Sequence, residues 1–210
     1  MKLIVFGATG GTGRQVVVQA LEAGHEVTVV VRQPAAFDIH HERMEVVQGD
    51  VLNFSSIEKL MSGKDAVVSA LGVSHRNPTT VYSEGTSNIM MAMRSAGIRR
   101  LICLSSAGLE IPADISFMQR IVIKLIVQRM FKNAYEDMAR MEKKVSQSCL
   151  DWTVIRPPRL TNGLRTGKYR TTANQHLQRA EGIARSDLAD YIVAHLDDYE
   201  SFQSRVEISY

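Results

Sequence analysis

The sequence predicts an α/β fold in which a doubly wound parallel sheet lies between two layers of helices. Three observations predict it. Short runs rich in apolar, β-branched residues alternate with helical segments along most of the chain. Most of these runs are nearly all apolar, as expected for parallel strands that are covered on both faces. The first run leads directly into a glycine-rich stretch, GATGGTG, at its junction with the first helical segment. Together these features are typical of a Rossmann-type, three-layer αβα fold.

Six strands are expected in the main sheet. They are placed at 2–6, 26–31, 44–48, 65–70, 100–105 and 152–156, and a short C-terminal strand follows at 205–209. Because helical segments separate them, the strands should pair in parallel in the order 3-2-1-4-5-6. A ligand crevice is then expected at the carboxyl ends of the first and fourth strands.

Helical segments fill the intervals between these strands. They are placed at 14–23, 54–61, 84–96, 117–148 and near 186–196, and the first three end just before a glycine. After Pro157 and Pro158 the pattern changes to short segments. We therefore expect one domain over residues 1–210, with residues 157–210 forming a small cap on the substrate side.

Composition excludes several classes of protein. The chain has 210 residues, of which 45% are apolar and 22% charged, and a net charge of +3. This small charge does not indicate a nucleic-acid partner. Residues 115–131 contain three basic side chains and are a poor membrane span. Cys103 and Cys149 lack metal-ligand spacing, and His40 and His41 have no evident partners, so no metal is expected. With no evident targeting segment, a cytoplasmic protein is expected.

The glycine-rich stretch lies between a strand and a helix, as a dinucleotide-binding loop requires. Gly7 would allow a tight turn, Gly10 and Gly11 would let the backbone approach a pyrophosphate, and Gly13 would let the helix pack closely. Hydroxyl donors at Thr9 and Thr12 can add to the backbone amides at the helix start. A merely structural turn is the weaker alternative.

Arg32 follows the second strand, where an acidic residue would bind the ribose of NAD. A guanidinium at this position can instead bind a 2′-phosphate through paired charge-assisted hydrogen bonds. The cofactor expected is therefore NADP(H), and Arg14 could assist. The alternative is a solvated arginine at a strand end.

Several segments together resemble a known family. They are GATGGTG, EVTVVVR, GDVLN, DAVVSALG, PTTVYSEGTSNIMMAM and the RPP-L pattern at 156–160. This combination resembles the atypical short-chain dehydrogenase/reductases, and among them most closely the flavin reductase/biliverdin-IXβ reductase family. The resemblance covers most of the chain and is strongest over residues 1–110.

The resemblance implies further cofactor contacts. They are Asp50 and Val51 on the adenine side, Ala70, Leu71 and Gly72 near the ribose and pyrophosphate, and Ser105, Pro157, Pro158 and Leu160 near the nicotinamide. All follow the carboxyl ends of expected strands, where this fold binds its ligands. For Asp50, a turn residue that caps the next helix is an equal alternative.

Two residues are candidates for catalysis. Many short-chain reductases use Tyr-x-x-x-Lys, but Tyr135 is followed four residues later by Ala139. Tyr135 is therefore a candidate pocket residue or a packed helix tyrosine. Ser106 is the candidate hydroxyl near the hydride path, or else a serine that bonds only the backbone. A flavin or linear tetrapyrrole can take its proton from solvent, so the missing lysine fits such an acceptor.

Three functions follow from these residues. The first is an NADPH-dependent oxidoreductase that transfers hydride to a small planar acceptor. The second is a non-catalytic NADP(H)-binding sensor or scaffold of the NmrA-like type. A sugar-nucleotide epimerase is disfavoured, because the Tyr-Lys pair is absent and the C-terminal part is short. A monomer or a weak homodimer is expected.

Overall fold

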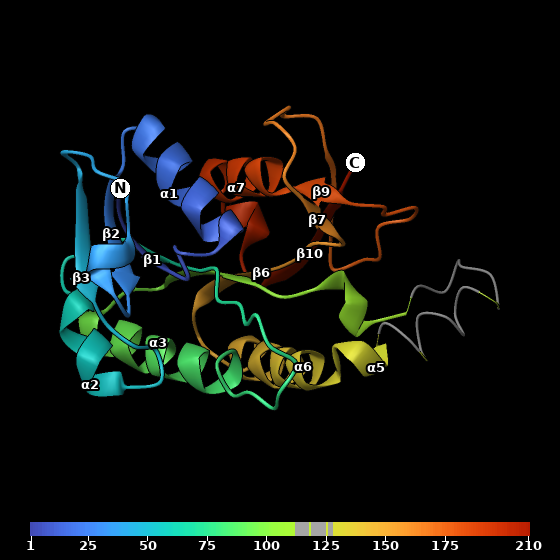
Figure 1. Ribbon diagram of the computed structural model, residues 1–210, viewed down its shortest axis with the longest axis horizontal. Coiled ribbons are helices and arrows are strands. Elements are labelled where there is room, and N and C mark those ends of the chain that lie inside the picture. Colours follow the sequence, from blue (N-terminus) through green and yellow to red (C-terminus); the bar gives the residue numbers. More distant parts are fainter. Residues whose placement is uncertain (112–117, 119–124, 126–127) are drawn as a thin grey trace.

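The computed structural model describes residues 1–111, 118, 125 and 128–210. An eight-stranded sheet crosses the molecule in the order β3-β2-β1-β4-β5-β6-β10-β8 (Figure 1). Its strands are β1 (Lys2–Phe6), β2 (Glu26–Val31), β3 (Met44–Gln48), β4 (Ala66–Ser69), β5 (Arg100–Leu104), β6 (Asp151–Arg156), β8 (Arg170–Ala173) and β10 (Ser204–Ser209). Neighbours pair in parallel, except β8, which pairs antiparallel with β10. The predicted order 3-2-1-4-5-6, with a C-terminal strand beside it, is confirmed.

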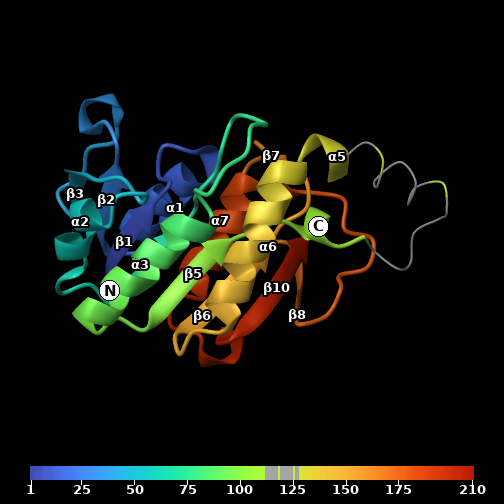
Figure 2. The same cartoon turned by 90° about the horizontal axis from the view of Figure 1, so that it is seen from below.

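Helices cover both faces of this sheet. One face carries α1 (Gly11–Glu22) and α7 (Arg185–Ala194), and the other carries α2 (Phe54–Ile57), α3 (Ser83–Ala96) and α6 (Lys132–Ser146), with the short α5 (Gln128–Met130) before α6. Figure 2 shows α3 and α6 lying side by side across the sheet. The result is the expected three-layer αβα arrangement.

Some element boundaries differ from the sequence-based prediction. Helix α1 begins three residues earlier than expected, because Gly10 takes an extended backbone and serves as its N-cap. The helix expected at 54–61 divides into α2 and a 3₁₀ turn at Glu58–Met61. Of the helix expected at 117–148, the structure describes α5 and α6, and most of 117–127 lies outside the described residues.

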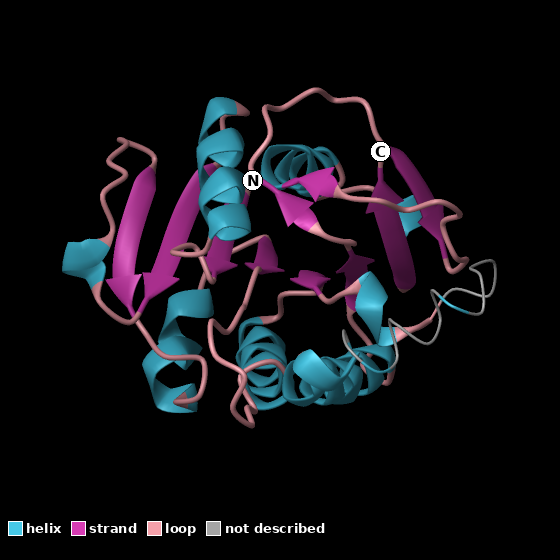
Figure 3. Cartoon of the chain, turned by 45° about the vertical axis from the view of Figure 1, so that its right-hand side comes forward, coloured by secondary structure: helices cyan, strands magenta, loops and turns pink. Residues whose placement is uncertain are grey.

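The core forms on both faces of the sheet because strand side chains alternate. In β1, Leu3 and Val5 pack in the cluster under α1 and α7, whereas Ile4 and Phe6 pack in the cluster under α3 and α6. All four are at most 1% exposed. The sheet therefore lies between two apolar layers (Figure 3). This packing fixes the positions of the strand ends, where the candidate site lies.

Residues after Pro158 extend the same body. Strands β8 and β10 lengthen the main sheet and α7 packs against α1. In the same part of the chain, β7 (Leu160–Thr161) and β9 (Ile183–Ala184) form a separate two-stranded parallel sheet. That residues 157–210 cap a substrate stays a prediction.

Candidate cofactor site

Two glycines in the first loop are required by the fold itself. Gly7 has a φ of +76°, and a Cβ on it would lie 2.2 Å from the carbonyl oxygen of Ala70. A Cβ on Gly13 would lie 2.3 Å from the carbonyl oxygen of Gly7. Both distances are far shorter than a van der Waals contact. These glycines therefore let the loop, the end of β4 and helix α1 pack closely together.

Gly10 is not required by the fold in the same way. A Cβ there would have one close neighbour, the carbonyl oxygen of Gly7 at 3.3 Å. Gly10 is also exposed and serves as the N-cap of α1 without a side-chain hydrogen bond. The first turn of α1 contains no acidic residue. It thus leaves backbone N–H groups and the positive end of the helix dipole for an anion.

A cavity of about 230 Å³ lies beside this loop at the carboxyl ends of β1, β2 and β4. Seven of the predicted residues line it: Gly7, Thr9, Arg32, Asp50, Val51, Leu71 and Gly72. Ala70 adjoins it through its close approach to Gly7. Thr12, by contrast, is buried, with 6% of its surface exposed. Loops that are far apart in the sequence therefore meet in one cleft at the predicted edge of the sheet.

Arg32 is exposed at the rim of this cavity and also lines a neighbouring hollow of about 430 Å³. Among the described residues no carboxylate lies within ion-pair distance of its guanidinium. Within the described part of the chain its backbone alone is hydrogen-bonded, since its carbonyl oxygen accepts from Gln48 Nε2 at 3.2 Å. Arg32 therefore has the freedom and the charge to bind a phosphate.

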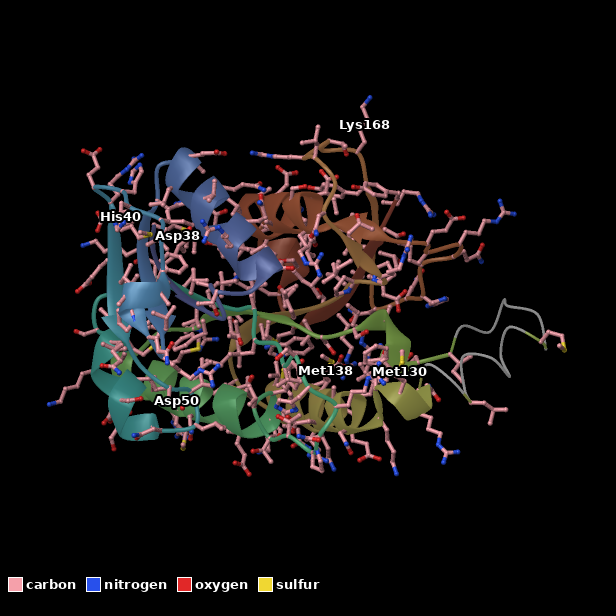
Figure 4. All side chains as sticks on the ribbon, viewed as in Figure 1. Asp38, His40, Asp50, Met130, Met138 and Lys168 are labelled. Atoms are coloured by element: carbon pink, nitrogen blue, oxygen red, sulfur yellow. The ribbon has the colours of Figure 1, made fainter. Side chains whose placement is uncertain are left out.

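Arg14 is engaged elsewhere. Its guanidinium donates to Asp38 Oδ1 at 2.5 Å, and this hydrogen bond holds the pKa of the Asp38 carboxyl below its usual value. Figure 4 shows Asp38 and His40 on the loop after β2.

In the described part of the chain, no group of three or more His, Cys, Asp or Glu residues could hold a metal ion.

Asp50 has the geometry of a turn residue. Its Oδ1 accepts from the backbone N–H of Leu52 at 3.0 Å, and its own N–H donates to Ser56 Oγ at 3.0 Å. The side chain still lines the 230 Å³ cavity, near α2 and α3 (Figure 4). The turn role is thus present, and a role in cofactor binding stays a prediction.

The residues expected near the nicotinamide follow β5 and β6. Ser105 is buried, and its hydroxyl has no hydrogen-bond partner among the described residues. Ser106 Oγ accepts from the Gly108 N–H at 3.1 Å, and the Ala107 N–H donates to the Pro157 carbonyl at 3.0 Å. This second contact joins the loops after the two strands. Ser106 thus has the local backbone bond that its alternative role requires.

Pro158 and Leu160 continue the chain from Pro157. Leu160 belongs to β7, where it pairs with Ile183 and packs on the core under α1 and α7. Neither residue lines the 230 Å³ cavity.

Tyr135 meets the same loop from α6. A Cβ on Gly108 would lie 2.3 Å from the Tyr135 hydroxyl, so that hydroxyl rests directly on the glycine. Tyr135 lines a separate hollow of about 540 Å³ together with Ala139 and Lys143. Lys144 points to α3, where its Nζ lies 2.9 Å from Ser87 Oγ. Neither lysine is hydrogen-bonded to Tyr135.

Asp137 lies beneath the PTTVYSEG segment and was not predictable from a local sequence pattern. This buried α6 carboxylate accepts from the Tyr82 N–H at 2.9 Å and also from the Ser83 N–H and hydroxyl. It thereby caps the start of α3. Tyr82 in turn accepts from the Val73 N–H at 3.2 Å, and burial raises the pKa of Tyr82. Asp137 therefore positions the loop that carries Leu71 and Gly72.

Two residues of α7 were also missed. The side chain of Arg185 lies over Gly11, with its Cδ 2.7 Å from the position of a Cβ there. Asp187 is fully buried and accepts four hydrogen bonds from the loop at 166–167 and from Tyr210. No local motif marks either residue, since both act across long stretches of sequence.

Comparison with known proteins identifies the family. The profile of an NAD(P)H-binding family matches residues 7–199. The chain belongs to this NAD(P)H-binding family. The match agrees with the resemblance to atypical short-chain dehydrogenase/reductases and extends through α7. It also establishes NAD(P)H as the ligand class of the family. The matched region of this chain begins at Gly7.

Several proteins of known description are similar to this member of the NAD(P)H-binding family. A (4-alkanoyl-5-oxo-2,5-dihydrofuran-3-yl)methyl phosphate reductase of Streptomyces griseus is 28% identical over 93% of this chain, which spans 58% of that protein. The anaerobilin reductase ChuY of Escherichia coli O157:H7 has a TM-score of 0.81 at 22% identity, covering 100% of this chain and 97% of that one. A Veillonella parvula short-chain dehydrogenase/reductase in complex with NADP has a TM-score of 0.83 at 18% identity, covering 100% and 94%. The two structures establish the fold.

No helix in the described part of the chain has the length and apolar character needed to cross a bilayer.

Proposed function

We propose that the protein is an NADPH-dependent oxidoreductase that transfers hydride to a planar acceptor such as a flavin or a linear tetrapyrrole. The observation that carries the NADPH preference is the unpaired guanidinium of Arg32 at the rim of the 230 Å³ cavity. It offers five N–H donors and no acceptor. It therefore attracts a 2′-phosphate and cannot accept a hydrogen bond from a ribose hydroxyl. The glycine loop would hold the pyrophosphate, and Asp50 and Val51 would lie on the adenine side.

The site around Tyr135 favours an acceptor that needs no protein proton donor. Ala139 stands where a lysine would lower the pKa of the tyrosine, and Tyr135 rests on Gly108. Bound nicotinamide supplies the hydride, and a delocalised acceptor can take its proton from water. The loops at 105–109 and 157–160 would hold the two planar groups together. The reductases among the similar proteins are consistent with this assignment.

Anaerobic oxidation of NADPH against a panel of flavins, tetrapyrroles and quinones tests the proposal. We expect turnover with at least one planar acceptor and little with simple aldehydes or ketones. The same Ala139 also fits a second candidate, a non-catalytic NADP(H)-binding sensor. A protein that binds both NADP⁺ and NADPH but oxidises NADPH with no acceptor in the panel would support the sensor and reject the reductase.

A further inference from the structure

Arg185 is the first residue of α7, and its side chain lies on the cofactor loop. Measured from the position of a Cβ on Gly11, its Cδ is at 2.7 Å and its Nε at 2.9 Å. Gly11 is itself the first residue of α1. The side chain therefore lies against the N-terminus of α1, although the two residues are far apart in the sequence.

This position is electrostatically unfavourable for a cation unless an anion is also present. The N-terminus of a helix carries a partial positive charge of about half an elementary charge. Arg185 lies at two such helix ends. Its side chain contacts the N-terminus of α1, and Arg185 is itself the first residue of α7. Its guanidinium donates to Asn162 Oδ1 at 2.6 Å, which is a neutral acceptor. Among the described residues, no carboxylate lies within ion-pair distance of it.

The nearest carboxylate in the sequence cannot supply this charge. Asp187 is directed to other partners, the Thr166 and Gly167 N–H groups and the hydroxyls of Thr166 and Tyr210. The start of α7 is also fixed to α1, because Gln19 Nε2 donates to the Ser186 carbonyl at 2.8 Å. The fold thus holds a guanidinium at the end of α1, and the residues that the structure describes provide no anion for it.

We propose that Arg185 binds the pyrophosphate of the cofactor at the N-terminus of α1. The α1 amides and the guanidinium would both contact the phosphates. This role also explains Gly11, where any side chain would displace Arg185. The inference rests on cofactor binding and is independent of the acceptor and of catalysis.

Dissociation constants of three ligands test the assignment in Arg185→Met, which keeps much of the aliphatic stem. We expect NADP⁺ and NAD⁺ both to bind about 10- to 100-fold more weakly, the range for a lost charge-assisted contact. Adenosine 2′-monophosphate, which has no pyrophosphate, should bind as it does to wild type, measured by competition with NADPH. Arg32→Ala should show the opposite pattern, with NADP⁺ and adenosine 2′-monophosphate weakened and NAD⁺ unchanged.

Arg165→Met is the matched control. It removes a charge that pairs with Asp190, a residue of α7, the helix that also carries Arg185. The Arg165 side chain has half its surface exposed, and the variant should leave all three dissociation constants unchanged. Arg185→Lys keeps the charge and most of the stem, so it should bind NADP⁺ with an affinity between those of wild type and Arg185→Met. This variant tests the assignment if Arg185→Met does not fold, because NADP⁺ should then still bind more weakly than to wild type.

Two results would overturn the assignment. One is an unchanged affinity for both dinucleotides in folded Arg185→Met. The other is a raised KM for FMN but not for riboflavin at unchanged cofactor affinity, which would mean that Arg185 binds a phosphate of the acceptor.

Discussion

Removing the Asp187 carboxylate should destabilise the protein, because one buried group satisfies donors from two other segments of the chain. Asp187 Oδ1 accepts from the Thr166 and Gly167 N–H groups at 2.7 and 2.8 Å. Its Oδ2 accepts from the Thr166 and Tyr210 hydroxyls at 2.9 and 2.6 Å. These bonds tie the loop after β7 and the C-terminal residue to the first turn of α7. The same turn carries Arg185, so the network also holds in place the residue proposed to bind the pyrophosphate.

The size of the effect depends on which bonds each variant can keep. Asp187→Ala leaves two backbone N–H groups and the hydroxyls of Thr166 and Tyr210 without their acceptor, and an orphaned buried group costs about 1–3 kcal/mol. Since residues 166 and 167 are exposed and water can reach them, we expect a total loss of about 2–4 kcal/mol. Asp187→Asn keeps the shape, and its amide can face the two hydroxyls, so about 1 kcal/mol is expected. Tyr210→Phe removes two hydrogen bonds, the one to Asp187 Oδ2 and the one from the Ala184 N–H, and should cost about 1–2 kcal/mol.

Urea unfolding followed by circular dichroism measures these differences as shifts in the midpoint at constant slope. The expected order of stability is wild type, then the asparagine and phenylalanine variants, then alanine. An Asp187→Ala protein within about 0.5 kcal/mol of wild type, the usual range for a neutral surface change, would refute the reasoning.

The pH dependence gives an independent check on the same carboxylate. Burial raises the pKa of Asp187, but hydrogen bonds from Tyr210, Gly167 and Thr166 outweigh it, so the pKa lies below its usual value. A depressed pKa in the folded state adds stability above the unfolded value of about 3.9 and loses it as the pH falls further. The stability gap between wild type and Asp187→Asn should therefore narrow below about pH 4 and stay constant above pH 5.5.

Three further predictions concern the cofactor and acceptor sites. Arg32→Ala should weaken NADPH binding by about 10- to 100-fold and leave NADH binding nearly unchanged, and high salt should reduce the preference of the wild type for NADPH over NADH. If the ratio of the NADPH and NADH dissociation constants is the same in both proteins, Arg32 is a solvated surface residue that does not bind the cofactor. Gly10→Val should lose NADPH binding with a smaller loss of stability than Gly13→Ala, because a Cβ on Gly10 would lie 3.3 Å from the Gly7 carbonyl oxygen whereas one on Gly13 would lie 2.3 Å from it; thermal melts and cofactor titration distinguish the two. Tyr135→Phe should keep most of the turnover with a planar acceptor, and a thousandfold fall in kcat would exclude a solvent proton.

Much of the fold could be predicted from the sequence because its strands are locally distinctive. Runs such as residues 26–31 are rich in apolar, β-branched residues, and helical segments separate most of them. The boundaries were less predictable. Glycine has a poor helix propensity, so the start of α1 at Gly11 is hidden in the same residues that mark the cofactor loop. Strand β8, with the polar sequence RTTA, forms by pairing at the sheet edge, which a local pattern does not reveal.

The two halves of the candidate site were predictable to different degrees. Residues that follow strands could be placed because parallel strands end at one edge, and Gly7, Arg32 and Leu71 indeed line one cavity. Asp137 and Arg185 could not be placed in this way. Each acts from a helix on a partner tens of residues or more away in the sequence, and their contacts depend on how α6 and α7 pack on the sheet.

The steric roles of the glycines separate what the fold needs from what the ligand needs. At Gly7 and Gly13 an added Cβ would collide with backbone, so these positions are occupied by the protein itself. At Gly10 a Cβ would have one tight backbone contact, at 3.3 Å, and at Gly11 the nearest atoms belong to the flexible side chain of Arg185. This is the arrangement expected if, as proposed, the phosphates of the cofactor bind here. The end of α1 and Arg185 are both positive and have no anion in the described structure, which supports that proposal.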